Sequence, residues 1–239
     1  DHRMTTGVKG FPMLNRNLSL KAKIMGLSLG MMLILACITI VMIQVQNKKQ
    51  KEMATGNMAV YATGLSAAIS TQFKQRYGDV QVFASNATMR FTDTNAIAEV
   101  LDTYVALNDA YDMIALFDIE GDLVIGNTKS ATGKELDYSK IEETSVKGSP
   151  WFINASKEKY SVDAKRGFDK TYVEDFQLDP LTTLAYGENR YGNSFSTAIK
   201  NTEGTVIAVL TARANFRWVE REFQSLYQSI KDNGIESAE

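Results

Sequence analysis

Residues 112–127 read DMIALFDIEGDLVIGN and predict a β-hairpin, because two apolar runs flank the Glu120-Gly121 pair. Apolar runs of strand length joined by a short turn containing Gly are typical of antiparallel pairing. Residues 194–212, SFSTAIKNTEGTVIAVLTA, repeat this pattern around a turn at Asn201–Gly204. The two hairpins therefore predict an antiparallel sheet.

Shorter helices and strands are predicted before, between and after the hairpins. The helices are expected at 95–107, 138–145 and 150–155 and from Asn215 onward, and the strands at 160–163, 171–175 and 182–187. Ser149 and Pro150 suit the N-cap and first turn of the third helix. Helices and strands in this order indicate an α+β fold rather than alternating βαβ units.

A long helix is predicted from residue 46 to about 90, a stretch without Pro. Apolar residues recur there every three or four positions, as a helical stripe requires. They are Met53, Val60, Tyr61, Leu65, Ile69, Phe73, Tyr77, Val80, Phe83 and Ala87. The stripe packs on its own domain or pairs with a second subunit. Both interpretations hold if the first half dimerises and the second half packs.

Residues 24–43, IMGLSLGMMLILACITIVMI, predict a membrane anchor. About 20 uncharged, mostly apolar residues in a helix span the hydrocarbon core of a bilayer. A cleaved signal peptide has a shorter apolar region and a small-residue cleavage site. Basic residues lie on both sides of the run, with more on the N-terminal side, which favours a cytoplasmic N-terminus.

Composition excludes several functional classes. The 239 residues include one Cys and one His, His2, which argues against an internal disulfide, a zinc cluster and His-based catalysis. Residues 47–239 carry 21 basic and 27 acidic side chains, an unfavourable balance for binding nucleic acid. The acidic stretch 163–179 has no catalytic spacing, so we expect no enzyme activity and no cofactor.

Five segments, in order along the chain, resemble bacterial methyl-accepting chemotaxis proteins with an extracytoplasmic Cache sensor domain. They are Leu14–Ile24 before the anchor, Ala115–Ile125 in the first hairpin, Ser149–Ala155, Thr171–Asp175, and Ser196–Leu210 in the second hairpin. The resemblance implies a PAS-like antiparallel sheet flanked by helices and carried on a long helix that emerges from the membrane. It also implies a small-molecule ligand.

The amino-acid-binding motif of that family is only partly matched. Trp151 and Phe152 fit its aromatic pair, and Tyr172 fits a later Tyr. Ser149 stands where the motif has Arg, and Arg213 stands near the place of its Asp. An Arg holds a carboxylate or phosphate where an Asp would hold an ammonium group.

The resemblance and the residue types together give a set of candidate ligand-binding residues. They are Trp151, Phe152, Tyr160, Asp169, Tyr172, Tyr186, Ser196 and Arg213. Each has a structural alternative: the aromatic residues fill the core or the surface rim, and Ser196 is a surface hydroxyl. Arg213 instead forms an ion pair with Asp169, Glu174 or Asp175.

The sequence thus predicts a cytoplasmic segment (1–23), a membrane helix (24–45), a stalk helix (46–90), a sensor domain (91–232) and the start of a linker or further module (233–239). The predicted function is ligand sensing for a bacterial inner-membrane chemoreceptor, with the sensor domain outside the cytoplasm and a homodimer formed through the stalk. The alternatives are the input domain of a sensor histidine kinase or diguanylate cyclase, and a structural or adhesive ectodomain.

Dimerisation through the stalk predicts a periodic cross-linking pattern. Single cysteines placed along residues 46–70 in membranes should cross-link between subunits with a period near 3.6 residues. The strongest cross-links are expected on the stripe that contains Met53, Val60, Leu65 and Ile69. Uniformly absent cross-links would count against a paired stalk.

Overall fold

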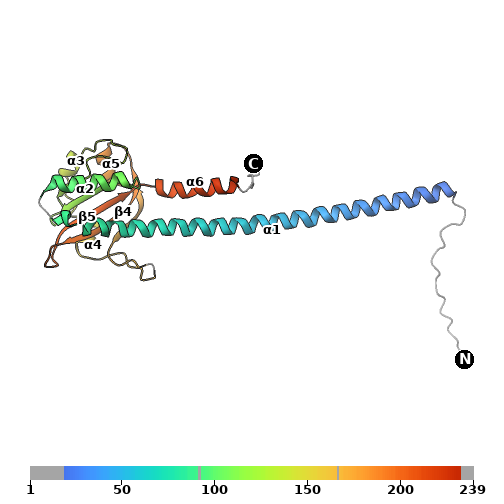
Figure 1. The fold of residues 1–239 in the computed structure, drawn as a ribbon, viewed down its shortest axis with the longest axis horizontal. Helices are drawn as coiled ribbons and strands as arrows, with labels where there is room; N and C mark the ends of the chain where they lie inside the picture. Colours follow the sequence, from blue (N-terminus) through green and yellow to red (C-terminus); the bar gives the residue numbers. More distant parts are fainter. Residues whose placement is uncertain (1–18, 91–92, 166, 233–239) are drawn as a thin grey trace, which may run out of the picture. The chain divides into compact units, whose positions relative to one another are not determined.

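The computed structural model describes residues 19–90, 93–165 and 167–232, and the chain divides between Val60 and Tyr61 into two units. The helices are α1 Leu20–Ser85, the 3-10 helix η1 Ala87–Arg90, α2 Thr94–Leu107, α3 Ser139–Glu142, α4 Pro150–Ser156, α5 Pro180–Tyr186 and α6 Arg217–Asp232 (Figure 1). The strands are β1 Tyr111–Asp118, β2 Leu123–Gly126, β3 Tyr172–Leu178, β4 Tyr191–Lys200 and β5 Val206–Ala214. Residues 1–18 of the predicted cytoplasmic segment, residues 91–92 and the predicted linker 233–239 lie outside the described residues.

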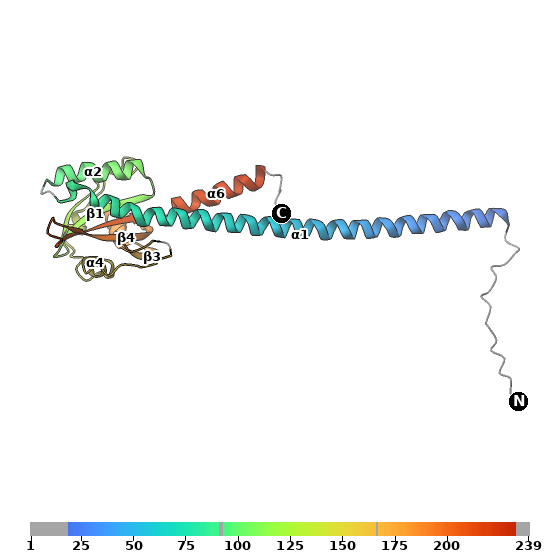
Figure 2. The same ribbon diagram turned by 60° about the horizontal axis from the view of Figure 1, so that its bottom comes forward.

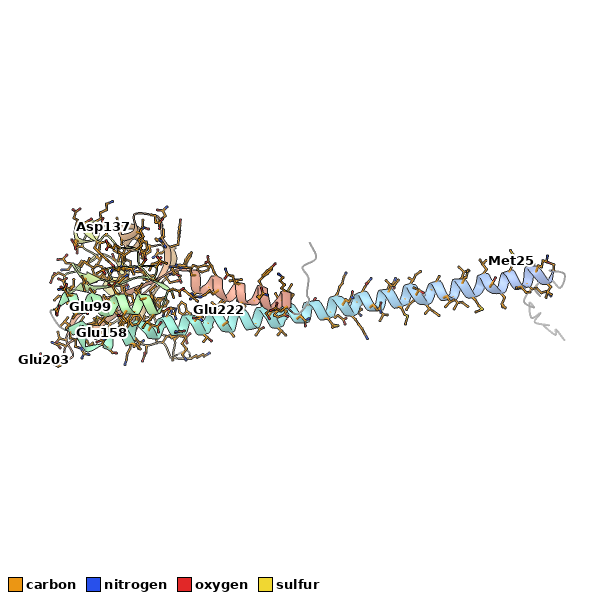
Figure 3. All side chains as sticks on the ribbon, turned by 45° about the horizontal axis from the view of Figure 1, so that its top comes forward. Met25, Glu99, Asp137, Glu158, Glu203 and Glu222 are labelled. Atoms are coloured by element: carbon orange, nitrogen blue, oxygen red, sulfur yellow. The ribbon has the colours of Figure 1, made fainter. Side chains whose placement is uncertain are left out.

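The first unit contains the N-terminal part of α1. Its apolar side chains project around the whole helix, and Met25 is 74% exposed (Figure 3). Within the described residues, α1 is the one helix that is long and apolar enough to cross a membrane. Apolar surface of this extent on every side of a helix is compatible with contact to lipid.

The second unit is built on a five-stranded antiparallel sheet with the order β2-β1-β5-β4-β3. Each predicted hairpin is present, as β1–β2 and β4–β5. The central strands β1 and β5 are buried along nearly their whole length, whereas the edge strand β3 becomes exposed toward its end. These observations confirm the predicted α+β fold with a long N-terminal helix.

The two faces of the sheet have different covers. Figure 2 shows α2 on one side of the strands and α4 on the other. One core joins α1 and α2 to the sheet through Tyr77, Val80, Leu101, Ile114, Phe195 and Leu210. The other core joins α3, α4 and α5 to the opposite face through Met113, Phe117, Ile141, Trp151, Phe152 and Leu181. The second half of the α1 stripe therefore packs on its own domain.

A buried polar contact anchors α1 to the start of β1. The Tyr111 hydroxyl donates to Asp79 Oδ2 at 2.8 Å, and Arg76 Nη1 donates to Asn108 Oδ1 at 3.2 Å. Burial, followed by the charge of Asp79, raises the pKa of Tyr111 well above its ordinary value. The phenol therefore stays protonated and remains a hydrogen-bond donor over the physiological pH range.

The prediction of a strand at 182–187 is wrong, because this segment belongs to helix α5. Asp179 caps the helix, Pro180 occupies its first turn, and Gly187 ends it with a φ of 69°. Pro at the first turn and Gly after the last residue form a helix signal. The β-branched and aromatic residues of Thr182–Tyr186 favoured a strand, but the two ends of the segment decided its conformation.

The predicted strand at 160–163 is also absent, since only an isolated bridge between Asp163 and Phe168 forms there. The helix predicted at 138–145 shortens to α3. Ser149 occupies the N-cap of α4 as expected, but its side chain makes no capping hydrogen bond.

Candidate ligand-binding site

A row of polar side chains lies on the sheet face that α4 and α5 cover. Strand register pairs Ser194 with Arg213, and Ser196 with both Thr211 and Tyr172. Glu174 pairs with Ser194 on the other side. Because side chains alternate between faces along a strand, these residues share one face. This region is the candidate site because it buries polar residues on a face that otherwise forms an apolar core.

Arg213 is the central residue of the row and is 2% exposed. Its Nη1 atom donates to Asp179 Oδ2 at 2.8 Å and lies 3.6 Å from Glu174 Oε2. Its guanidinium carbon lies 4.5 Å from the ring centroid of Trp151, a cation–π distance. Its Nε and Nη2 atoms are buried and have no hydrogen-bond partner.

Asp179 is the buried carboxylate that neutralises Arg213. Its Oδ1 atom accepts hydrogen bonds from the backbone N–H of Thr182 at 2.9 Å and from the Thr182 hydroxyl at 3.0 Å. Oδ2 receives the Arg213 bond, so both oxygens are satisfied. The same side chain therefore caps α5 and fixes one edge of the guanidinium.

The prediction that Arg213 pairs with Asp169, Glu174 or Asp175 is only partly right. Asp169 and Asp175 are exposed, and the ion-pair partners of Arg213 are Asp179 and Glu174. Asp179 was not among the predicted partners. The segment after it was predicted as a strand, so Asp179 was not recognised as a helix cap. The dipeptide Asp179-Pro180 is the signal that identifies a helix cap there.

The hydroxyl groups of the row are already paired with neighbours. Ser194 Oγ donates to Glu174 Oε2 at 2.8 Å, and Ser196 Oγ lies 2.8 Å from Thr211 Oγ1. Ser196 is fully buried, so its interpretation as a surface hydroxyl is wrong.

The aromatic candidates divide into two groups. Trp151, Phe152, Tyr172 and Tyr186 belong to the core beside α4 and α5, and Trp151 packs edge-on against Phe117 with a centroid distance of 5.4 Å. Tyr160 lies outside the named strands, and its hydroxyl accepts a bond from the Ala198 N–H at 3.4 Å. The structure therefore brings Trp151 onto Arg213 but leaves Tyr160 and Asp169 away from this cluster.

Tyr186 makes a structural contact at the end of α5. Its hydroxyl donates to the backbone carbonyl of Asp112 at 2.9 Å, and the Arg190 guanidinium lies 4.1 Å from its ring centroid. Burial, followed by the charge of Asp112, raises the pKa of Tyr186 to about 12. The phenol is thus a neutral donor at physiological pH.

Asp112, a buried residue that sequence reasoning did not single out, connects the sheet to α6. Its Oδ1 atom accepts hydrogen bonds from Asn215 Nδ2 and Arg217 Nη2, each at 3.0 Å. Its Oδ2 atom lies 3.4 Å from Arg190 Nη1. Asp109 forms a further ion pair with Arg221, whose hydrogen bond lowers the pKa of that carboxyl.

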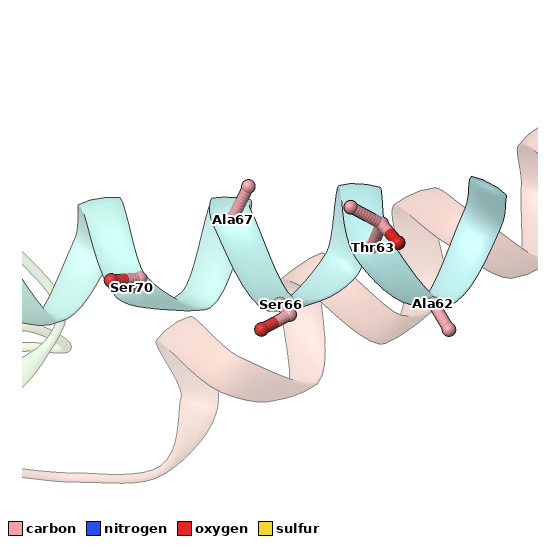
Figure 4. A pocket seen from close by; sticks show the side chains of 5 residues that line it. All are labelled: Ala62, Thr63, Ser66, Ala67 and Ser70. Atoms are coloured by element: carbon pink, nitrogen blue, oxygen red, sulfur yellow. The ribbon is translucent and has the colours of Figure 1, made fainter. Parts of the chain in front are cut away.

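A separate groove of about 530 Å³ lies on α1 and is lined by small side chains (Figure 4). They are Ala62, Thr63, Ser66, Ala67 and Ser70. No charged residue lines the groove, and none of the candidate residues contributes to it. Within residues 19–90, 93–165 and 167–232, no cluster of three or more His, Cys, Asp or Glu side chains is arranged to hold a metal ion.

The buried pair predicts that Asp179→Asn destabilises the domain by about 3–5 kcal/mol, because it leaves Arg213 without its neutralising charge. Asn retains an oxygen that can cap α5, so the loss reports mainly on the ion pair. Denaturation of the chain in detergent micelles, followed by tryptophan fluorescence, measures it. Asp175→Asn, an exposed change, is the control and should alter the free energy of unfolding by less than about 0.5 kcal/mol. Equal effects of the two changes would contradict the prediction.

No family model and no curated protein matches the chain. Among solved structures, it is similar to the sensory domain of the Campylobacter jejuni chemoreceptor Tlp3 with isoleucine bound, at 15% identity and a TM-score of 0.52, covering 72% of this chain and 63% of that one. The same domain in complex with L-valine gives 16% identity, a TM-score of 0.51 and the same coverage. The sensor domain of the Vibrio cholerae histidine kinase DctB gives 10% identity and a TM-score of 0.46, covering 73% and 61%.

The chain thus spans about three-fifths of the length of these solved domains. Its similarity to the Tlp3 structures covers 72% of this chain and concerns the fold. The chain therefore has the fold of these ligand-binding sensory domains.

Proposed function

We propose that this chain is the membrane anchor and extracytoplasmic ligand-sensing region of a bacterial transmembrane chemoreceptor. It binds a small molecule between the sheet and α4–α5, and binding changes the arrangement of the helices that lead to the membrane. The role is sensory and non-enzymatic. The same region would serve a sensor histidine kinase or a diguanylate cyclase, because the input does not depend on the output domain.

The polar row under Trp151 is the observation that supports ligand binding. The core on the opposite face, toward α1 and α2, is mainly apolar, and its buried Arg76 is held by Asp79 and Asn108. The face toward α4 and α5 instead buries Arg213, Glu174, Ser194 and Ser196 among aromatic side chains. Small-molecule sites combine apolar and aromatic walls with a few placed polar groups in this way.

The proposed route to the membrane starts at the end of β5. Arg213 lies two residues before Asn215, and Asn215 and Arg217 both donate to Asp112. The second residue of α6, Trp218, is buried with Ala110 and is packed by Ile69 and Phe73 of α1. Gln72 of α1 also donates to Glu222 of α6, labelled in Figure 3, at 3.0 Å. A ligand that repositions β5 would therefore act on both helices.

The proposed location is the bacterial inner membrane, with the second unit in the periplasm. The apolar part of α1 and the basic residues before it support this orientation. A homodimer formed through the stalk completes the proposal, because the membrane-near half of the stripe, including Met53 and Val60, is exposed within one chain.

The proposed topology predicts where a membrane-impermeant maleimide reacts. In a Cys37→Ser background, Thr202→Cys places a thiol in the exposed turn between β4 and β5. It should be labelled in intact cells whose outer membrane is permeabilised. Thr5→Cys should be protected in the same cells and labelled only after lysis. The reverse pattern would overturn the orientation.

Ligand sensing predicts that at least one small metabolite stabilises the chain in lipid nanodiscs. A ligand at a hundredfold excess over its Kd stabilises the folded state by about 2.7 kcal/mol, which raises the melting temperature. The measurement is a thermal-shift screen of a metabolite library. Trp151 reports locally in a Trp218→Phe variant, because these are the two tryptophans of the chain. A complete library without a stabilising compound would favour the structural ectodomain instead.

A further inference from the structure

Arg213 is buried, and two of its three guanidinium nitrogens have no hydrogen-bond partner. Nη1 is engaged by Asp179, whereas Nε and Nη2 have no partner although the side chain is 2% exposed. Buried polar groups in folded proteins are almost always paired, so each exception requires an explanation. Two orphaned donors on one charged group are more costly to the folded state than one.

The other buried side-chain donors without partners do not form such a pair. Within the described part of the chain they are Arg76 Nε and Trp218 Nε1, one atom in each residue. Arg76 Nε also lies 3.2 Å from Asp79 Oδ2, so a carboxylate already faces it. Arg213 is therefore distinguished by two free donors on the same planar group.

The positions of these two atoms define what can bind. The N–H groups at Nε and Nη2 point in parallel from one edge of the guanidinium plane. A planar carboxylate matches this edge and accepts one hydrogen bond on each oxygen. Asp179 on Nη1 and the Trp151 ring at 4.5 Å hold the plane in place, so the edge is oriented before a ligand arrives.

We propose that the Nε/Nη2 edge of Arg213 binds the carboxylate of a small organic monocarboxylate. This inference rests on the proposed sensory function and specifies the chemistry of its ligand. The ligand carboxylate would therefore contact β5, and no charged residue of α4 is required.

Glu174 supplies the selectivity for a single negative charge. Its Oε2 atom lies 3.6 Å from Arg213 Nη1, and its side chain is 14% exposed. Asp179 and Glu174 both approach Nη1, so the Nε and Nη2 donors can bond a first carboxylate directly. A second carboxylate on the ligand would lack these donors and would be repelled by the two acidic groups at low dielectric. Dicarboxylates and phosphate esters should therefore bind more weakly than monocarboxylates.

The test uses the chain in nanodiscs, with Trp151 fluorescence in the Trp218→Phe background as readout. The probes are sodium salts of straight-chain, hydroxy-substituted and amino-substituted monocarboxylates, with succinate and glycerol phosphate as the doubly charged comparison. At least one monocarboxylate should bind saturably and more tightly than either comparison compound.

Arg213→Lys is the decisive variant, because it keeps a positive charge for Asp179 but removes the parallel donors. Affinity for the best monocarboxylate should fall tenfold or more. Arg190→Lys is the matched control, because Arg190 pairs with Asp112 and Glu188 instead. The affinity of this variant for the same monocarboxylate should stay within twofold of that of the unsubstituted chain. Glu174→Gln should narrow the difference in affinity between the monocarboxylate and succinate.

The outcomes separate this inference from the proposed function. Unchanged monocarboxylate affinity in Arg213→Lys overturns the carboxylate contact and leaves ligand sensing standing. If succinate binds the unsubstituted chain as tightly as the best monocarboxylate does, the proposed selectivity role of Glu174 is overturned. Binding of only uncharged or cationic library compounds overturns the inference, and a library without any binder overturns the sensory function itself.

Discussion

The second unit depends on one buried carboxylate, Asp179, which serves two parts of the structure at once. One oxygen caps α5 through the N–H and hydroxyl of Thr182, and the other accepts the bond from Arg213. A buried Arg without a partner would be strongly unfavourable, and so would an uncapped helix end inside a core. The position of α5 over the sheet and the orientation of Arg213 are therefore set by the same side chain.

The two faces of the sheet bury different kinds of side chain. Its α1–α2 face is an apolar core in which Tyr77, Leu101 and Phe195 are almost fully buried. Its α4–α5 face interrupts an apolar core with a polar row that includes Ser194, Ser196 and Arg213. Packing on the first face fixes the strands, and the second face can then hold charged groups whose positions depend on strand register.

Asp112 plays a comparable part at the end of the sheet. It contacts Asn215, Arg217 and Arg190, which come from the β5–α6 connection, α6 and the segment after α5. The segment after α5 and the start of α6 therefore contact the same buried carboxylate. Such shared contacts are the physical basis on which two elements can move together.

The sequence by itself determined the features that local patterns control. The uncharged run of residues 24–43, the helical stripe and the two hairpins each follow from spacing within one segment, and they were sufficient for the α+β fold. Arg213 and Trp151 were both candidate residues from the sequence, and the structure places the guanidinium carbon 4.5 Å from the ring centroid. The segment 182–187 was misassigned because its side chains favour a strand while its flanking Pro180 and Gly187 favour a helix.

Only the tertiary structure decided which groups meet Arg213. Asp179 lies 34 residues before it, and Glu174 reaches it across β4 through the register that pairs Glu174 with Ser194 and Ser194 with Arg213. Asp179 and Glu174 both approach Nη1, which leaves the Nε and Nη2 atoms without a partner. Strand register and the docking of α5 are long-range choices governed by the burial of whole faces, and a one-residue shift in register would move every one of these side chains to the opposite face.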